Sequence, residues 1–463
     1  MNSKKLLASG AIYTVSNIFV KGINFLTIPI FAAIMTQEAF GGFSLYASWV
    51  AIFSIVIGLQ TNSVLNIGKR DYPNEYKHYL NTALSISTIF FIIVFWLIFI
   101  FKNYLANILN FSPNIILVLF IQSYLSYIFV FINSYFVFEE KPKSYSIVAF
   151  VYTLFNVLLS LILVLNFEND QIIARIYGMF IPSAILTVMF YFTIYSKTRV
   201  LLERKFAAEI FILSFPIILH GLGNQILMQL DRIMISDFLG LKANALYSFG
   251  YNVALILNVV WSSLNSAWVP WYFEQDRLGN FEKIKEFAKN YTYIFTFITI
   301  VFLFVSPEIV QLMGNEVYEK SKNFVPWIIA SYFLVFLYSF PVNVEFLKKN
   351  TKLIPIGTLL AGVSNYFLNL FMIPVYGIMG AALATLFSYI LLFVFHYVLV
   401  KIIYKYNDIH IGILGGSFIF IIFNTILCVY LIENILMRYI LLLLYFLVAA
   451  IWYKKIKTKG IFN

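Results

Sequence analysis

The stretch YLNTALSISTIFFIIVFWLIFIF (Tyr79–Phe101) decides the class of this protein, because it holds no charged side chain. As a helix, it is long enough to cross the roughly 30 Å of hydrocarbon in a bilayer. The whole chain follows this pattern: it is 61% hydrophobic and only 11% charged over 463 residues. A soluble domain would carry about twice that charged fraction. The sequence lacks the alternation of apolar and polar residues that marks the strands of a membrane β-barrel. We therefore predict an all-α polytopic membrane protein.

Apolar runs of this kind, separated by short charged loops, make up nearly the whole chain, and each is interpreted as a membrane-spanning helix. The fourteen expected spans are residues 7–35, 41–67, 79–101, 113–138, 144–166, 172–195, 208–236, 244–272, 288–305, 324–347, 353–374, 377–400, 411–432 and 435–453.

The positions of the basic residues give the orientation. With the N-terminus in the cytoplasm, 24 of the 32 Lys and Arg residues fall in cytoplasmic segments, 7 fall outside, and Lys21 lies within the first span. Such an excess of basic residues marks the cytoplasmic loops of membrane proteins. We therefore predict an even number of spans with both termini cytoplasmic, in the cytoplasmic membrane of a bacterium. The net charge of +11 follows from this topology and does not indicate a nucleic-acid partner.

The chain resembles a duplication with a period of about two hundred residues. FSLY (Phe43–Tyr46) corresponds to YSFG (Tyr247–Gly250), Asn156 to Asn365 and Asn369, and Gly178 to Gly380. Two parallel six-helix repeats would handle substrate between them. We predict lobes at 1–205 and 206–405, with the basic segment Ser196–Lys205 as their boundary, and two additional helices with a basic tail at 406–463. The alternative to a duplication is that these matches reflect only the general similarity of any two apolar helices.

Polar residues within the first span form one stripe. Thr14, Asn17, Lys21 and Asn24 recur at three- and four-residue intervals, which places them on one helix face. A lysine at mid-span costs at least about 2.5 kcal/mol, so Lys21 should face protein or water. We expect it to line a cavity; helix packing and snorkelling to the surface are the alternatives.

The seventh span, the counterpart of the first, is also rich in polar residues. Asp231 and Arg232 near its outer end are either an interfacial pair or part of a gate or substrate site. Further polar residues would line the same space from the second, seventh and eighth spans. They are Gln60, Asn62, Asn66, His220, Asn224, Gln225, Gln229, Asn258, Ser262 and Asn265. Asn365 and Asn369 are alternatively glue between helices, and the segment Gly377–Tyr389 indicates small-residue packing.

Motifs for chemistry are absent. The sequence has no P-loop, no HExxH and no cluster of metal ligands, and Cys428 is its one cysteine. We therefore predict a protein that is not an enzyme, with no catalytic residue, cofactor or metal. Its energy source would be an ion gradient, the membrane potential or the substrate gradient. The first six spans hold no acidic residue that a coupling ion would use.

Several segments resemble a known family. LDRIMISDFLG (Leu230–Gly240), ALYSFGYNVA (Ala245–Ala254) and YGIMGAALAT (Tyr376–Thr385) look like polysaccharide flippases of the multidrug/oligosaccharidyl-lipid/polysaccharide (MOP) exporter superfamily. GGFSLYASW (Gly41–Trp49) is similar to Wzx-type O-antigen and capsule flippases. The resemblance covers most of residues 1–400.

The resemblance implies a central cationic cavity that binds an oligosaccharide linked to undecaprenyl pyrophosphate. The cavity would open alternately to each side of the membrane. Asp231 and Arg232 match an acidic–basic segment of the family. Lys21 would supply a point charge for pyrophosphate, and amides with Trp261 suit sugar hydroxyls and rings. The expected substrate-binding residues are Asn17, Lys21, Asn24, Asn62, Asn224, Gln225, Asp231, Arg232, Asn258 and Trp261.

Alternative functions remain at this point. A drug or cation antiporter of the same superfamily is disfavoured because the first six spans lack an acidic site. A lipid II flippase is a close variant that the last two helices permit. A membrane-embedded polymerase or acyltransferase would need convergent acid and base residues. The expected partners are membrane lipids, H⁺ or Na⁺ as coupling ion, and a polysaccharide polymerase.

Overall fold

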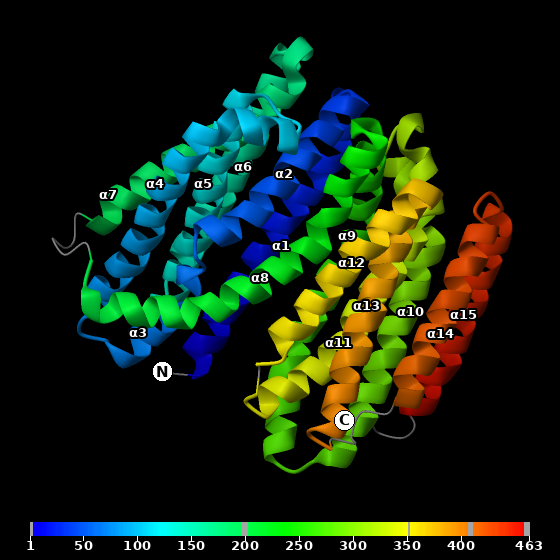
Figure 1. Cartoon of the computed structure of the whole chain (residues 1–463). Helices are drawn as coiled ribbons and strands as arrows, with labels where there is room; N and C mark the ends of the chain where they lie inside the picture. The colour runs from blue at the N-terminus through cyan, green and yellow to red at the C-terminus, as the bar shows by residue number, and fades with distance from the viewer. Residues whose placement is uncertain (1–2, 196–201, 351, 406–410, 458–463) are drawn as a thin grey trace. The chain divides into compact units, whose positions relative to one another are not determined.

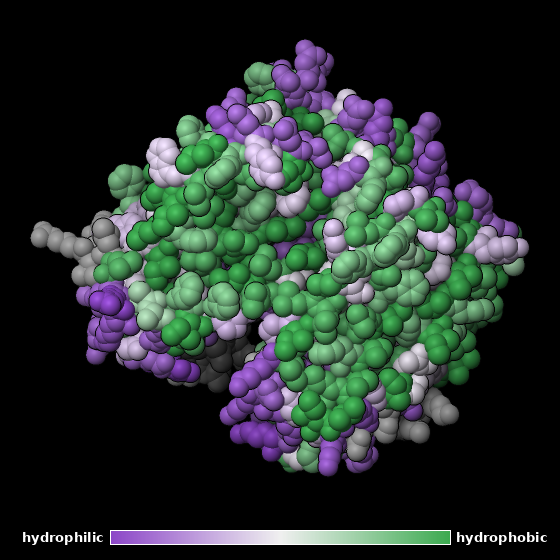
Figure 2. Space-filling view, viewed as in Figure 1, coloured by the Kyte–Doolittle hydropathy of each residue, from purple (hydrophilic) through white to green (hydrophobic). Residues whose placement is uncertain are grey.

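The computed structural model describes residues 3–195, 202–350, 352–405 and 411–457. Residues 196–201 of the expected lobe boundary, and 406–410 and 458–463 of the expected C-terminal region, lie outside this part. Fourteen helices in the described chain are long and apolar enough to cross a membrane, which confirms the predicted all-α membrane fold (Figure 1). On the face that Figure 2 shows, apolar side chains cover the middle of the helices and hydrophilic ones gather near helix ends.

The elements follow one another with short connections. They are α1 (Ser3–Ile34), α2 (Gln37–Ile57), η1 (Thr61–Val64), α3 (Leu65–Asp71), α4 (Tyr76–Leu109), α5 (Pro113–Phe138), α6 (Pro142–Asn166), η2 (Glu168–Asp170), α7 (Gln171–Tyr195), α8 (Arg204–Leu239), α9 (Leu241–Arg277), α10 (Phe281–Met313), η3 (Glu316–Asn323), α11 (Val325–Leu347), α12 (Ile354–Tyr376), α13 (Ile378–Ile402), α14 (Ile411–Tyr430) and α15 (Ile435–Lys457).

The second span differs from its prediction. The sequence predicts one helix over 41–67, but α2 ends at Ile57, and Leu59 and Gln60 adopt left-handed backbone with φ of 51° and 50°. The chain then continues as η1 and α3. Gly58 lies directly against the Tyr127 ring of α5, where a Cβ atom would come within 1.9 Å of Cδ2. The predicted single helix was therefore wrong beyond Ile57, because a tertiary contact breaks it.

The contacts divide the chain into two compact units, Met1–Ala245 and Leu246–Asn463. In the first unit, α5 packs against α2, α4 and α7, α1 packs on α6, and α8 packs on α2. The boundary between compact units thus lies one helix later than the predicted repeat boundary at residue 205, because α8 belongs with α2. The division into six-helix repeats stays a prediction.

In the second unit, α11 is the central helix. Its apolar window is 89% buried and it packs against α10, α13 and α14, whereas the window of α15 is only 6% buried. Such a helix, apolar and almost entirely exposed, is suited to face lipid. The last helix is therefore peripheral to its unit.

The predicted correspondence of Gly178 and Gly380 has a structural parallel. A Cβ atom on Gly178 of α7 would lie 2.4 Å from Ser160 Cα of α6, and one on Gly380 of α13 would lie 2.2 Å from the Met372 carbonyl oxygen of α12. Small residues let membrane helices approach closely. Each glycine thus permits close packing of the same consecutive pair of helices in its half. The contact at Gly380 also confirms the small-residue packing predicted for 377–389.

Candidate functional site

The predicted polar stripe of the first helix lies on α1. Lys21 and Asn24 are exposed, while Asn17 Oδ1 accepts a hydrogen bond of 2.7 Å from the Tyr145 hydroxyl on α6. Asn17 therefore helps to pack α1 on α6. The side chains of Lys21 and Asn24 remain on the surface of the helix, as residues that meet water or a ligand would.

Asn62 lies outside α2, not in the continuous second helix that the sequence predicts. It is in η1, only 8% exposed, and its Nδ2 donates to Ser134 Oγ on α5 at 3.4 Å. The neighbouring Thr61 hydroxyl bonds to the Tyr127 hydroxyl at 2.5 Å and donates to the Ala83 carbonyl at 3.0 Å. Because α2 ends before these residues, Gln60, Asn62 and Asn66 do not share a helix face. Asn62 therefore occupies a packing position. A place for these three residues along the substrate space stays a prediction.

On α8, the predicted residues fall in different environments. Asp231 is fully buried and Asn224 is exposed. Arg232 Nη1 donates to Gln229 Oε1 at 2.5 Å, and the Ser48 hydroxyl of α2 donates to the same oxygen at 3.1 Å. Arg232 is thereby tied to α2 within the first unit. Gln225 Oε1 is buried and has no hydrogen-bond partner among the described residues.

One face of α9 carries buried polar atoms. Asn258, Trp261 and Asn265 follow at intervals of three and four residues, which places them on one side of the helix. Asn258 Oδ1, Trp261 Nε1 and Asn265 Oδ1 are all buried, and within the described chain none has a hydrogen-bond partner. Leaving one such atom unsatisfied costs about 1–3 kcal/mol. A row of three is therefore a candidate site for a ligand with hydroxyl groups.

An apolar groove of about 760 Å³ lies between α10, α14 and α15. The Tyr445 hydroxyl donates to Asn424 Oδ1 and the Thr296 hydroxyl to its own helix, so these polar groups are already bonded. Gly412 and Gly416 of α14 leave open space where a side chain would project. The groove is lined by Tyr293, Ile294, Thr296, Phe297, Ile300, Gly412, Ile413, Gly416, Ser417, Phe420, Tyr445, Val448, Ala449 and Trp452.

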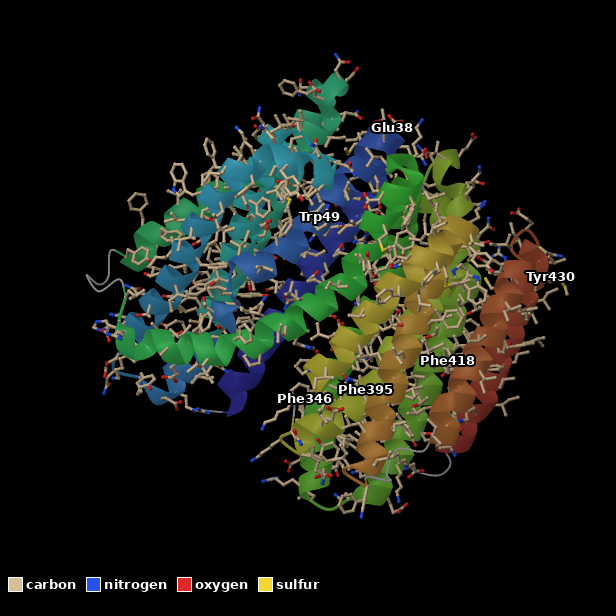
Figure 3. The ribbon with its side chains drawn as sticks, viewed as in Figure 1. Glu38, Trp49, Phe346, Phe395, Phe418 and Tyr430 are labelled. Carbon is tan, nitrogen blue, oxygen red and sulfur yellow. The ribbon has the colours of Figure 1, made fainter. Side chains whose placement is uncertain are left out.

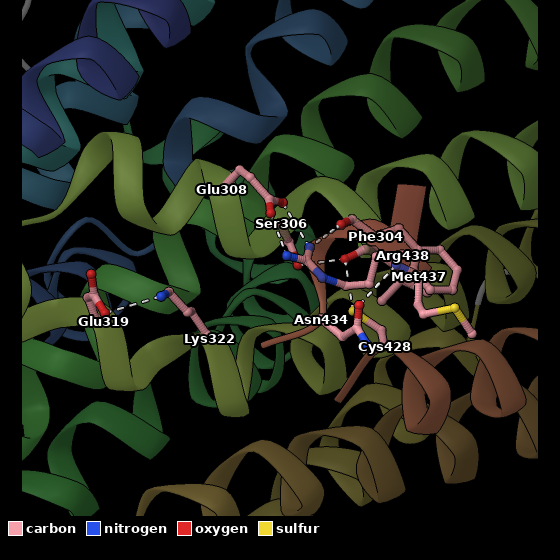
Figure 4. Close-up of polar contacts among 10 residues, drawn as sticks. Phe304, Ser306, Glu308, Glu319, Lys322, Cys428, Asn434, Met437 and Arg438 are labelled. Carbon is pink, nitrogen blue, oxygen red and sulfur yellow. Dashed lines mark hydrogen bonds and ion pairs between the residues drawn. The ribbon is translucent and has the colours of Figure 1, made fainter. Parts of the chain in front are cut away.

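Two pairs of ionisable side chains inside the second unit were missed by the sequence analysis. Arg438 of α15 is 1% exposed, and its guanidinium donates to both carboxylate oxygens of Glu308 and to the Phe304 carbonyl on α10 (Figure 4). His396 of α13 bonds to Glu345 of α11. The available signal was a lone ionisable residue inside an apolar run, as in FLFVSPEIVQL (Phe302–Leu312).

The chain matches the polysaccharide biosynthesis protein family over residues 6–275, more than half of its length. A Lsg locus protein of Haemophilus influenzae is 24% identical over 371 residues, which cover 76% of this chain and 87% of that protein. An uncharacterized membrane protein of the same organism is 23% identical over 351 residues, covering 74% of this chain and 82% of its own.

Solved structures of low sequence identity show the same fold. The lipid II flippase MurJ in an inward closed conformation has a TM-score of 0.68 at 16% identity, covering 96% of this chain and 99% of its own. An inward-facing multidrug resistance MATE family transporter of the MOP superfamily has a TM-score of 0.59 at 11% identity, covering 85% and 99%. The MurJ structure matches 96% of this chain. The remaining residues are too few to contain both α14 and α15, so the match extends into the last two helices. The chain therefore belongs to the polysaccharide biosynthesis protein family, as its motifs predicted, and it is a multi-pass membrane protein with the fold of MOP-superfamily transporters.

Proposed function

We propose that this protein is a flippase that moves an oligosaccharide linked to undecaprenyl pyrophosphate across the cytoplasmic membrane by alternating access. Its product would feed the synthesis of a surface polysaccharide such as O-antigen or capsule. The family match supports a role in polysaccharide biosynthesis, and the fold is one that MOP-superfamily transporters use. The observation that carries the proposal is the row of buried polar atoms on α9.

The α9 row suits a sugar. Asn258 Oδ1 and Asn265 Oδ1 can each accept a hydrogen bond from a hydroxyl group, and Trp261 Nε1 can donate one. An indole also offers a flat apolar face against which a sugar ring can pack.

The pyrophosphate and the polyprenyl chain of the proposed substrate would each have a suitable feature in this protein. Lys21 is an exposed lysine within a span, and an ammonium group is a point charge suited to a pyrophosphate. The groove between α10, α14 and α15 is apolar and lies along helices that face lipid, so it would hold part of the polyprenyl chain. The last two helices would then form the lipid side of the substrate path.

The first test uses proteoliposomes loaded with a fluorescent lipid-linked oligosaccharide, and measures its arrival in the opposite leaflet. Asn258→Leu should slow flipping roughly 3- to 10-fold at limiting substrate, since one hydrogen bond contributes about 0.5–1.5 kcal/mol. Ser263→Ala is the control, because Ser263 lies elsewhere on α9 and its hydroxyl bonds to the Val259 carbonyl of its own helix. Equal rates for both variants would remove the α9 row from the site.

The neighbouring functions differ in substrate. A lipid II flippase would move lipid-linked peptidoglycan precursor in preference to oligosaccharide, and a drug or cation antiporter would move organic cations without any lipid. Coupling to H⁺ or Na⁺ and a partnership with a polysaccharide polymerase are parts of the proposal. Imposing each ion gradient singly on the proteoliposomes tests the first.

A further inference from the structure

Two ionisable side chains meet in the dry interior of the second unit. Glu345 of α11 and His396 of α13 are both 0% exposed, and His396 Nδ1 lies 2.5 Å from Glu345 Oε1. The two residues are 51 positions apart in the sequence, so the pairing depends on the packing of α11 on α13.

The pair is enclosed by protein, but one polar atom on each side chain makes no hydrogen bond with the described residues. Glu345 Oε2 and His396 Nε2 are buried and have no hydrogen-bond partner within the described residues. Gly357 of α12 leaves room for the imidazole, since a Cβ atom there would lie 2.5 Å from Nε2. The rings of Tyr338 and Phe395 lie 5.4 Å and 5.2 Å from the imidazole ring. These described neighbours, a glycine and two aromatic rings, carry no charge at neutral pH.

The titratable groups near the pair in the described part of the chain come from α11, α13 and the segments that follow them. On α11 itself, the Tyr338 ring lies against the imidazole, and Tyr404 follows the end of α13. On α13 the next ionisable residues are Tyr397 and Lys401, whose ammonium lies 5.9 Å from the Tyr397 ring. From α12 the pair meets Gly357, which does not titrate. Lys348 and Lys349 follow the end of α11 and are exposed.

The pair lies close to one end of its helices. Glu345 is two residues before the end of α11 at Leu347, and His396 is six residues before the end of α13 at Ile402, about 9 Å along a helix. The chain neighbours Phe346 and Phe395 lie at the same end of the second unit (Figure 3). The lysines at this end place it on the side predicted to be cytoplasmic, so a proton has a short path between the pair and water.

Burial restricts the charge that the pair can hold. With one shared proton it is neutral overall, either as an imidazolium with a carboxylate or as an imidazole with a carboxylic acid. Loss of that proton leaves a buried carboxylate bonded to a neutral imidazole, and burial disfavours such a charge. Groups this close titrate as one unit rather than separately. Proton loss would therefore disfavour the closed packing of α11 on α13 and admit water.

We infer that Glu345 and His396 form a proton-binding site that takes up one proton from the cytoplasmic side and couples it to the packing of α11 against α13. The site binds the proton without help from any cofactor or substrate. Its use as the coupling site for transport rests on the proposed function, whereas proton binding itself does not.

The direct test counts protons in the purified protein, without substrate. Wild type and Glu345→Gln are titrated between about pH 5 and pH 8, the range in which histidine ordinarily changes charge. The amide of Glu345→Gln still accepts a hydrogen bond from His396 Nδ1–H but cannot ionise. The wild type should bind one proton more than the variant across the range. A flat difference curve, with the variant folded, would overturn the proposal, because a purely structural pair keeps its proton.

A second variant covers the case in which Glu345→Gln does not fold. Glu345→Gln/His396→Gln places two amides that can bond to each other and removes both titrating groups, so the same difference of one proton is expected. Thermal unfolding of each variant checks that the fold is retained.

The pH dependence of flipping gives a separate test with a matched control. His78 and Glu203 form a pair of the same chemistry at 2.6 Å, but with side chains 38% and 26% exposed. His78→Gln should keep the pH profile of flipping, whereas Glu345→Gln should flatten it. Proton binding with an unchanged profile would overturn coupling alone, and absence of flipping in wild type would count against the proposed function instead.

Discussion

The buried guanidinium group of Arg438 links α15 to α10. It bonds to Glu308 and to the Phe304 carbonyl, both on α10. Removing one partner of a buried ion pair leaves the other charge uncompensated, at a cost of about 3–5 kcal/mol. Glu308→Ala should therefore lower the thermal unfolding midpoint by several degrees, measured by tryptophan fluorescence in detergent micelles.

The control is a pair of the same type in water. Glu274 Oε1 and Arg277 Nη2 lie 2.7 Å apart, but their side chains are 49% and 73% exposed. Exposed pairs contribute about 0–1 kcal/mol, so Glu274→Ala should leave the midpoint nearly unchanged. Equal effects of the two substitutions would contradict the stabilising role of Arg438.

Glu139 gives a prediction about pH. Burial tends to raise the pKa of this carboxyl, but bonds to Lys69 and Lys141 outweigh burial and hold its pKa below the ordinary value of 4.5. A lowered pKa means that the carboxylate stabilises the fold above pH 4.5 and that this contribution is lost as the pH falls through the lowered value. Glu139→Gln should thus unfold at a lower temperature than wild type at pH 7 and at a similar temperature in strong acid. A difference that persists in acid would contradict it.

Sequence reasoning reached some residues of the site and missed others for a physical reason. Periodicity places Asn258 and Asn265 on one face of α9, because neighbours along one helix are fixed by its geometry. It cannot pair Glu345 with His396, since that contact depends on which helices pack together. The packing contact of Asn62 was not predicted, because the sequence predicted a continuous helix over 41–67 whereas α2 ends at Ile57.

The last two helices carry a prediction at the scale of elements. Gly415 and Gly416 are neighbours on α14, and a side chain on either would meet open space in the described structure. Only Gly416 lines the groove. Gly416→Leu should fill part of the groove and slow flipping of a long-chain polyprenyl substrate several-fold, while Gly415→Leu should not.

The readout of this comparison is the flipping rate in proteoliposomes, with thermal unfolding to confirm that both variants fold. A short-chain substrate analogue should be less affected by Gly416→Leu, because it occupies less of the groove. If both leucine variants flip the long-chain substrate at the wild-type rate, the groove does not hold the lipid chain.

At the level of elements, the apolar pattern predicted the existence of all fourteen spans but not all their ends. Many helices, such as α4 and α8, extend beyond the expected span because helical hydrogen bonding continues past the hydrocarbon region. The break after α2 could not be predicted from VIGLQTNSV (Val56–Val64), which contains no proline and only one glycine. It is set by the Tyr127 ring against Gly58.

At the scale of the whole molecule, composition and loop charge were sufficient to predict a multi-pass membrane protein, because the bilayer admits few folds. The division into compact units was less accessible. Sequence similarity places α8 at the start of the second repeat, whereas its contacts with α2 place it in the first unit. A repeat records sequence correspondence, and a compact unit records packing, so the two boundaries need not coincide.

The most direct test of the central claim compares wild type and Lys21→Ala in proteoliposomes that hold a fluorescent undecaprenyl-pyrophosphate oligosaccharide. The account predicts that the lipid arrives in the opposite leaflet only when the protein is present. Without the Lys21 ammonium the rate should fall roughly 10- to 150-fold, because a single charge-assisted bond contributes about 1.5–3 kcal/mol. No movement of any lipid-linked sugar, together with gradient-driven efflux of organic cations, would contradict the account and identify an antiporter.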